Sequence, residues 1–213
     1  MTAIPQTKEI ELPANRIITR TLTNTPDFHY LLRLSDRPDP KRMLVLIHGI
    51  SRQATSMMRL LEHRAEQLNY TLIAPVFNRW SYRDYQRLGR ATHGHRADLA
   101  FNAMLLDLRE QTGLEGLVHL LGFSGGAQFA HRYAYAYPNR LRSISLAAAG
   151  WYTAPREKLR FPYGTAATTR LENLEFDIDS LLSTPTLTLV GENDTLRDSA
   201  VRSSLRIDNR QGS

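Results

Sequence analysis

Residues 122–126 combine a serine with glycines at a spacing that suits nucleophilic catalysis. The segment Gly122-Phe123-Ser124-Gly125-Gly126 has the pattern G-x-S-x-G, with the apolar run Leu117–Leu121 before it and a helical pattern after it. At such a strand–turn–helix junction the serine is strained and exposed at the positive end of the helix, and larger neighbours would collide with adjacent backbone. The pattern predicts a nucleophile elbow at Ser124; the alternative is a serine that only caps the helix.

The chain also carries candidates for stabilising an oxyanion. The apolar run Met43–Ile47 is followed by His48-Gly49-Ile50-Ser51. A loop at this place can direct backbone N–H groups toward the oxyanion, beside the N–H of the residue that follows the nucleophile. We therefore expect an oxyanion hole made by the N–H groups of Gly125 and Ile50, with Ser51 as the alternative to Ile50. His48 is expected to be structural, its ring bonding within the loop.

A third polar group, Gly191-Glu192-Asn193-Asp194, follows the apolar run Thr186–Val190. A carboxylate at this place can hold a histidine in the tautomer that accepts a proton from the serine. Asp194 is the candidate, and Glu192 and Asp198 are weaker alternatives. The other interpretation is that Asp194 only helps to turn a loop or to cap a helix.

The elements that must position these residues alternate between apolar runs and amphipathic helical patterns. Helices are expected over residues 54–68, 97–112 and 125–137, and strands over Arg16–Leu22, Phe28–Leu34, Met43–Ile47, Tyr70–Pro75, Leu117–Leu121, Ser143–Ala149 and Thr186–Val190. The alternation predicts an α/β fold, a mostly parallel sheet with helices on both faces and an antiparallel pair near one edge. Ligands of such sheets bind outside the carboxyl ends of the strands, where the three polar groups stand.

Length and composition exclude several classes of protein. With 213 residues, 42% hydrophobic and 23% charged, the chain suits one globular domain rather than a disordered or membrane-spanning protein. It has no Cys, hence no disulfide or thiolate site, and its net charge of +6 is spread without a basic block, which argues against nucleic-acid binding. No signal-peptide pattern opens the chain, so we expect a cytoplasmic location.

Together these motifs resemble the α/β-hydrolase superfamily. The strand ending in His48-Gly49, the elbow at Ser124 and the acid at Asp194 occur in the order of that superfamily, from about residue 40 to the end. The segments 122–126, 147–152 and 160–164 are similar to single-domain esterases of the polyhydroxybutyrate-depolymerase-like and dienelactone-hydrolase-like groups. The resemblance implies hydrolysis of a small or oligomeric ester through an acyl-enzyme on Ser124, with no metal or organic cofactor.

The resemblance also reveals a missing part. The superfamily places its general base, a histidine, on a loop beyond the acid, but none of the seven histidines follows Asp194. Either the sequence is C-terminally shortened, with the last strand, the last helix and the histidine beyond residue 213, or the domain is naturally incomplete and inactive. We prefer a shortened sequence, because an incomplete domain leaves Thr186–Val190 as an apolar edge strand. His93 and His95 remain as surrogate bases, metal ligands or ordinary loop residues.

The connection over residues 151–185 is expected to wall the substrate pocket within a single domain, residues 1–213. Trp151 and Tyr152 stand nearest the catalytic edge, and Trp80 and Tyr82 are expected opposite them. The connection is too short for a lid domain, which favours an open cleft for small or extended esters. The alternatives are that these aromatic residues only pack the connection, that the chain is a non-catalytic binding module, or that it is a thioesterase, peptidase or perhydrolase of the same fold.

Overall fold

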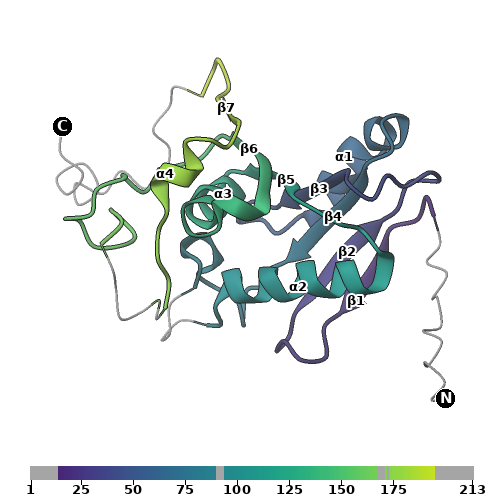
Figure 1. The fold of residues 1–213 in the computed structure, drawn as a ribbon, viewed down its shortest axis with the longest axis horizontal. Helices are drawn as coiled ribbons and strands as arrows, with labels where there is room; N and C mark the ends of the chain where they lie inside the picture. The colour runs from purple at the N-terminus through teal and green to yellow at the C-terminus, as the bar shows by residue number, and fades with distance from the viewer. Residues whose placement is uncertain (1–13, 90–93, 167–170, 172, 195–213) are drawn as a thin grey trace, which may run out of the picture.

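A seven-stranded sheet forms the centre of the protein (Figure 1). The computed structural model describes residues 14–89, 94–166, 171 and 173–194. The strands are β1 (Ile18–Thr21), β2 (His29–Arg33), β3 (Met43–Ile47), β4 (Thr71–Val76), β5 (Val118–Phe123), β6 (Leu141–Ala147) and β7 (Thr186–Leu189). The helices are α1 (Ala54–Gln67), α2 (Ala97–Thr112), α3 (Gly125–Ala136) and α4 (Ile178–Leu181), with single 3₁₀ turns η1 (Tyr85–Arg87) and η2 (Pro138–Arg140).

The sheet has the order β1-β2-β4-β3-β5-β6-β7 and is mostly parallel. The pairs β1–β2 and β2–β4 are antiparallel, and every later pair is parallel. The predicted α/β class and the antiparallel pair at one edge are therefore confirmed. Because β3, β5 and β6 are parallel neighbours, their carboxyl ends meet at one edge of the sheet.

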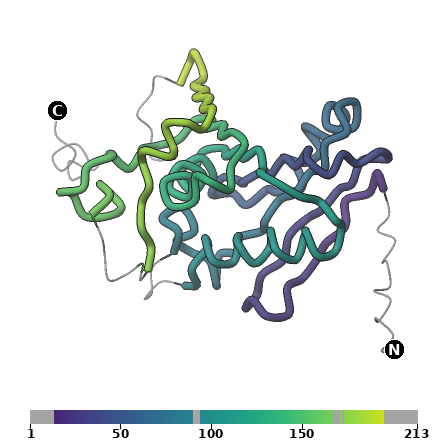
Figure 2. Tube along the Cα trace, viewed as in Figure 1, coloured from purple at the N-terminus to yellow at the C-terminus, as the bar shows by residue number. Residues whose placement is uncertain are grey.

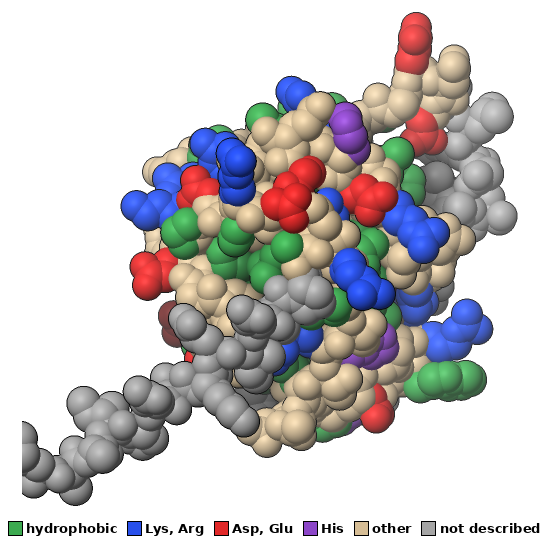
Figure 3. Space-filling view, turned by 90° about the vertical axis from the view of Figure 1, so that its right-hand side faces the viewer, with side chains coloured by type: hydrophobic (Ala, Val, Ile, Leu, Met, Phe, Trp, Pro, Cys, Tyr) green, Lys and Arg blue, Asp and Glu red, His purple; other side chains and the backbone are tan. Residues whose placement is uncertain are grey.

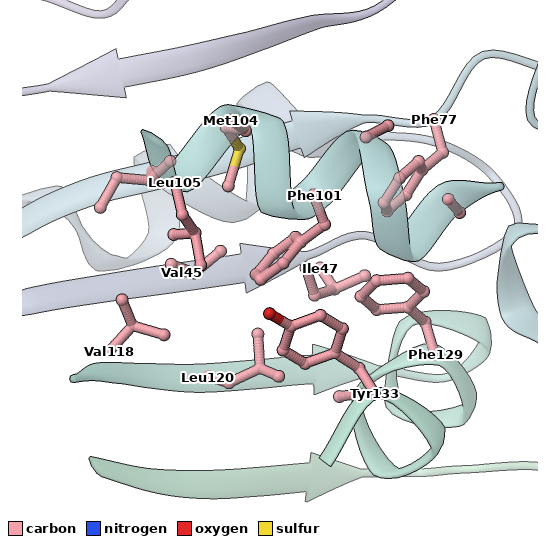
Figure 4. Close-up of a cluster of buried hydrophobic side chains, with 14 of the residues drawn as sticks. Val45, Ile47, Phe77, Phe101, Met104, Leu105, Val118, Leu120, Phe129 and Tyr133 are labelled. Atoms are coloured by element: carbon pink, nitrogen blue, oxygen red, sulfur yellow. The ribbon is translucent and has the colours of Figure 1, made fainter. Parts of the chain in front are cut away.

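Helices cover both faces of the sheet, as the sequence predicts. Helices α2 and α3 lie on one face, and their apolar side chains form the larger core with those of β3 and β5 (Figure 4). In that core Phe101 of α2 and Tyr133 of α3 make an edge contact with ring centroids 4.6 Å apart. Helix α1 packs on the opposite face through Ala54, Met58 and Ala65, in a smaller core.

The helix ends follow the stop signals of the sequence. Gly113 caps α2 in the left-handed conformation, with φ 66°, and Pro138 lies two residues beyond the end of α3. Several strand limits differ from the expectation by one or two residues, and the pairing explains the largest differences in β5 and β6. Strand β5 continues to Phe123 because Gly122 still pairs with Ile47 of β3, and β6 begins earlier because Leu141 pairs with Val118.

The last part of the sheet is much less covered than the first. All four residues of β7 are exposed. The side chains of Leu187 and Leu189 point to the same face of the sheet that α1 covers at other strands. The segment from the end of β6 to β7 runs mainly as turns, with α4 as its one short helix among the described residues (Figure 2). Within the described part of the chain, β7 is thus an apolar edge strand.

The surface visible in Figure 3 mixes basic and acidic side chains over the same area. That face carries no extended region of a single charge, which agrees with basic residues spread along the sequence. Among the described residues, no helix is both long and apolar enough to cross a bilayer.

Candidate active site

Ser124 stands in a sharp turn between β5 and α3. Its backbone angles, φ 53° and ψ −115°, lie outside the regions that residues with a side chain usually occupy. The Ser124 N–H donates to the Ala147 carbonyl at 2.8 Å, and its own carbonyl accepts from the N–H groups of Ala127 at 3.0 Å and Gln128 at 3.2 Å. Strand and helix together hold this residue in a conformation that it would not adopt alone.

The glycines on either side of Ser124 are required by close backbone contacts. A Cβ atom on Gly122 would collide with the carbonyl of Gly126, and one on Gly126 would collide with the carbonyl of Ile47, the last residue of β3. Both clashes are with main-chain atoms, which cannot move aside independently. The G-x-S-x-G spacing thus lets α3 start directly against β5 and β3.

The loop after β3 lies against the turn at Ser124. Gly49 is so close that a Cβ there would lie 3.5 Å from Ser124 Cβ, and Ile50 Cγ2 lies 2.9 Å from the position of a Cβ on Gly125. The Gly49 carbonyl accepts from the Arg52 N–H at 3.0 Å, which closes the loop as a turn. The structure therefore brings together Ser124, Gly125 and Ile50, which sequence reasoning grouped from distant positions.

His48 links two loops and has no ring atom left for catalysis. Its Nε2 accepts the Phe77 N–H at 3.0 Å, so the proton is on Nδ1, which donates to the Gly49 carbonyl at 2.9 Å. Burial lowers the pKa of His48 to about 4, so the ring is neutral at pH 7. The structural role that the sequence predicts for His48 is confirmed.

Two residues of η1 border the site, and sequence reasoning missed both. The buried Tyr85 donates its hydroxyl to the His48 carbonyl at 2.9 Å, and burial raises its pKa. Gln86 Nε2 lies 2.5 Å from the position of a Cβ on Gly125, so its amide stands next to the residue after Ser124. The only signal in the sequence was the aromatic, polar composition of residues 76–96.

The segment after β6 is fastened to α3. Trp151 is partly exposed, and its ring centroid lies 4.2 Å from the Arg132 guanidinium carbon; Tyr152 is 37% exposed. Thr153 follows and is buried, with its N–H donating to His131 Nε2 at 2.9 Å. Trp151 and Tyr152 thus lie beside the helix that begins at the turn. Tyr82, expected in the same pocket, is buried instead, because its hydroxyl bonds the Pro26 carbonyl and its ring packs against Phe28.

No described histidine hydrogen-bonds to Ser124. His131 has both ring nitrogens engaged, with Nδ1 donating to the Ala127 carbonyl at 3.0 Å, and full burial lowers its pKa well below 6.5. His119, expected in the strand core, is only half-buried, because it faces the α1 side of the sheet and bonds Ser143 Oγ at 2.7 Å. His95 lies with its ring centroid 5.8 Å from that of Tyr82. His93 lies outside the described residues.

Asp194 occupies a turn beyond β7. Its N–H donates to the Gly191 carbonyl at 3.0 Å, and the residue is exposed, as is Glu192. Two strand spacings, roughly 10 Å, separate β7 from β5, which carries Ser124. The structure therefore places Asp194 at the same sheet edge without joining it to Ser124, and Asp198 lies outside the described residues. In the ranges that the structure describes, no three His, Asp or Glu side chains are grouped as a metal site would require.

Comparisons with known proteins identify the family and the fold. A family model described as alpha/beta hydrolase fold matches residues 42–194. No curated protein matches the chain. A solved structure of poly(aspartic acid) hydrolase-1 from Sphingomonas sp. KT-1 superimposes with a TM-score of 0.71 at 22% identity, covering 89% of this chain and 78% of that one.

Two further solved structures share the fold. LpqC, a poly(3-hydroxybutyrate) depolymerase from Bordetella parapertussis, has a TM-score of 0.63 at 22% identity, over 82% of this chain and 64% of that one. The chain thus spans less than two thirds of the depolymerase. FphF, a fluorophosphonate-binding serine hydrolase from Staphylococcus aureus, has a TM-score of 0.60 at 16% identity, over 84% and 80%. At these identities the superpositions establish a shared fold.

Proposed function

The chain belongs to the α/β-hydrolase fold family, and on that premise we propose that it is a serine hydrolase of carboxylic esters with Ser124 as nucleophile. The observation that carries the proposal is the strained backbone of Ser124, with φ 53°. Strain of this kind persists only where the surrounding structure imposes it, and it clusters at functional sites; here the strained residue directly precedes α3 and lies beside the loop after β3.

In the proposed reaction Ser124 Oγ attacks the ester carbonyl carbon while its proton passes to a histidine base. The oxyanion accepts hydrogen bonds from the N–H groups of Gly125 and Ile50. The carbonyl re-forms as the alcohol leaves with the proton from the base, and water then releases the acid by the same route. Gly125 begins α3, so its N–H has no partner within the helix.

We further propose that the base is supplied from outside the described residues and that Asp194 orients it. His48 and His131 support this by exclusion, since both are buried, neutral and bonded at both ring nitrogens. A base-free serine is a poor nucleophile. The base would therefore have to enter from the side of Asp194, and His93 is the alternative source.

The substrate that we propose is a small or oligomeric ester bound in an open cleft. Residues 151–185 would form one wall, with Trp151 and Tyr152 nearest the serine. Two structural neighbours are named as hydrolases of polymers, poly(aspartic acid) and poly(3-hydroxybutyrate), which supports a cleft that takes an extended chain.

The test is covalent labelling of Ser124 by a fluorophosphonate, on protein from its source whose intact mass is recorded first. We expect one adduct on the peptide that contains Ser124, no adduct in Ser124→Ala, and an unchanged adduct in Ser56→Ala, a control at an exposed serine of α1. Hydrolysis of short-chain nitrophenyl esters should be lost in Ser124→Ala alone. Wild-type protein that is neither labelled nor hydrolytic would overturn the proposal.

The second candidate function is that of a non-catalytic binding module. The observation that favours it is that none of the described histidines hydrogen-bonds to Ser124. The labelling experiment separates the two, since a binding module would retain an unmodified Ser124 after prolonged exposure to the probe.

A further inference from the structure

Arg132 of α3 is a fully buried arginine held in place by contacts with two other segments and with its own helix. Its Nε donates to Thr153 Oγ1 at 2.8 Å, and its Nη1 donates to the carbonyl of Gln86 and, at 3.3 Å, to that of Gln128. The planar guanidinium stacks on Trp151, 4.2 Å from the ring centroid. These contacts fix the group and leave Nη2 buried with no hydrogen-bond partner.

The guanidinium of Arg87 lies near the same indole and also has a buried nitrogen without a hydrogen-bond partner among the described residues. Arg87 of η1 lies with its guanidinium carbon 5.9 Å from the Trp151 centroid, and its Nη1 donates to Asp84 at 3.2 Å. Its Nε is buried without a partner. Buried polar atoms are satisfied in the great majority of cases, so two unsatisfied donors around one ring require a physical reason.

The charges of this cluster, defined as Asp84, Arg87, Arg132 and Trp151, do not balance. Among the described residues of the cluster, two guanidiniums lie near one carboxylate, that of Asp84, and the neighbouring His131 is neutral. Burial first, and then the charge of Arg87, lowers the pKa of Arg132 to about 9. Unpaired charge is costly at low dielectric, so an anion entering the cluster would be bound favourably.

The cluster borders the candidate active site. Gln86, whose carbonyl accepts from Arg132, directs its side-chain amide at Gly125. Gln128 lies one helical turn from Ser124, and its carbonyl also accepts from Arg132. The Arg87 side chain is 21% exposed and Trp151 is partly exposed, so these two side chains form the edge of the cluster that faces solvent.

We propose that Arg132 and Arg87, against the ring of Trp151, bind a carboxylate carried by the substrate away from its scissile ester. Guanidinium N–H groups match the planar geometry of a carboxylate, and Nη2 of Arg132 and Nε of Arg87 supply the two donors. The inference rests on the proposed esterase function and narrows its substrate class to esters with a free carboxylate, such as half-esters of dicarboxylic acids.

The test uses Trp151 as its own reporter and requires no turnover. The chain has two tryptophans, so Trp80→Phe, at a 76% exposed position, leaves Trp151 as the only one. Titrating this variant with monomethyl succinate should change the emission with saturation, and neutral dimethyl succinate should not. Adding Arg87→Met should weaken the affinity at least tenfold, and adding Arg59→Met, which removes an exposed arginine of α1, should leave it unchanged.

Arg132→Met should abolish the change in emission. Because that variant removes a buried group, it can fail to fold, and Arg87→Met then serves as the test. An equal response to the diester, or an unchanged affinity in Arg87→Met, would overturn the inference. Repeating the titration in Ser124→Ala separates it from the proposed function. Half-ester binding without labelling of Ser124 would contradict the proposed esterase function and support the carboxylate site. Labelling of Ser124 without half-ester binding would contradict only the carboxylate site.

Discussion

The nucleophile and the acid of the candidate site lie in regions with opposite packing. The elbow region, residues 47–52 and 122–128, is held by main-chain contacts between β3, β5 and α3, with His48 as a buried link to the next loop. The acid region, residues 186–194, is exposed at every position and contacts the sheet along one side of β7 only.

The difference shows which part of the site is fixed by the described fold alone. Ser124 occupies an unfavourable backbone conformation because several packed segments leave it no other. Asp194 has no comparable support, because a segment with little buried surface opens locally at low cost. We infer that the acid region opens at a lower free-energy cost than the elbow region.

The largest expected effect comes from adding one methyl group in each region. Gly126→Ala drives its Cβ into the Ile47 carbonyl and should destabilise the protein by about 3 kcal/mol or more, because the clash is with main chain. Gly191→Ala meets only Asp194, with its Cβ at 3.6 Å and its N at 4.0 Å, which are ordinary contacts, and should change the free energy of unfolding by less than about 0.5 kcal/mol. Urea unfolding of both variants checks this, and similar losses in the two would contradict the comparison.

A large-to-small substitution in each region should give the next largest difference. Leu120→Ala removes a side chain that is 1% exposed in the main core and should cost about 3 kcal/mol. Leu189→Ala removes one that is 47% exposed and should cost less than about 1 kcal/mol. Thermal unfolding followed by circular dichroism measures both. A costly Leu189→Ala would mean that β7 is covered in solution.

Much of the elbow region could be predicted from the sequence because its requirements are strict. Only glycine fits at 122 and 126, and a serine between two such glycines, directly after an apolar strand, is typical of a nucleophile elbow. The strand and helix order followed from periodicity, and Gly113 and Pro138 marked helix ends correctly. These signals are local in the sequence, so they can be interpreted without knowing which segments pack against them.

The residues that sequence reasoning missed depend on contacts between distant segments. Gln86 and Tyr85 reach the site because η1 folds against α3, and nothing in residues 76–96 has a period that indicates this. Tyr82 was assigned to the pocket, but its ring packs in the core because its hydroxyl can donate to the Pro26 carbonyl. Arg132 gave no signal, since an arginine on a helix is usually exposed.

The neutral histidine of the elbow region should make stability depend on pH. His48 has a pKa of about 4 in the folded protein and about 6.5 when unfolded, so below pH 6.5 the unfolded chain binds the extra proton. Stability should therefore be fully present above pH 6.5 and fall toward pH 4, by about 2 kcal/mol from His48 between pH 7 and pH 5. His131 acts with the same sign.

Denaturant unfolding at pH 7, 6 and 5 measures this loss, and the acid region contributes no histidine to it. In His48→Asn the fall from pH 7 to pH 5 should be smaller, although the variant is less stable at pH 7. A wild-type stability that is constant over this range would show that His48 is accessible to protons, and the link between the loops after β3 and β4 would then be weaker than its hydrogen bonds indicate.

The smallest effect tests the strain at Ser124 directly. At φ 53° and ψ −115° a residue with a Cβ is strained, and glycine is not, so Ser124→Gly should be more stable than Ser124→Ala by about 1 kcal/mol. Both variants lack the hydroxyl, so the comparison isolates the backbone. The matched control is Ser51→Gly against Ser51→Ala, at a neighbouring position without a positive φ, where glycine should give no gain. If glycine and alanine were equally stable at 124, the surrounding segments would impose no strain there, and the contrast with the loosely held acid region would lose its physical basis.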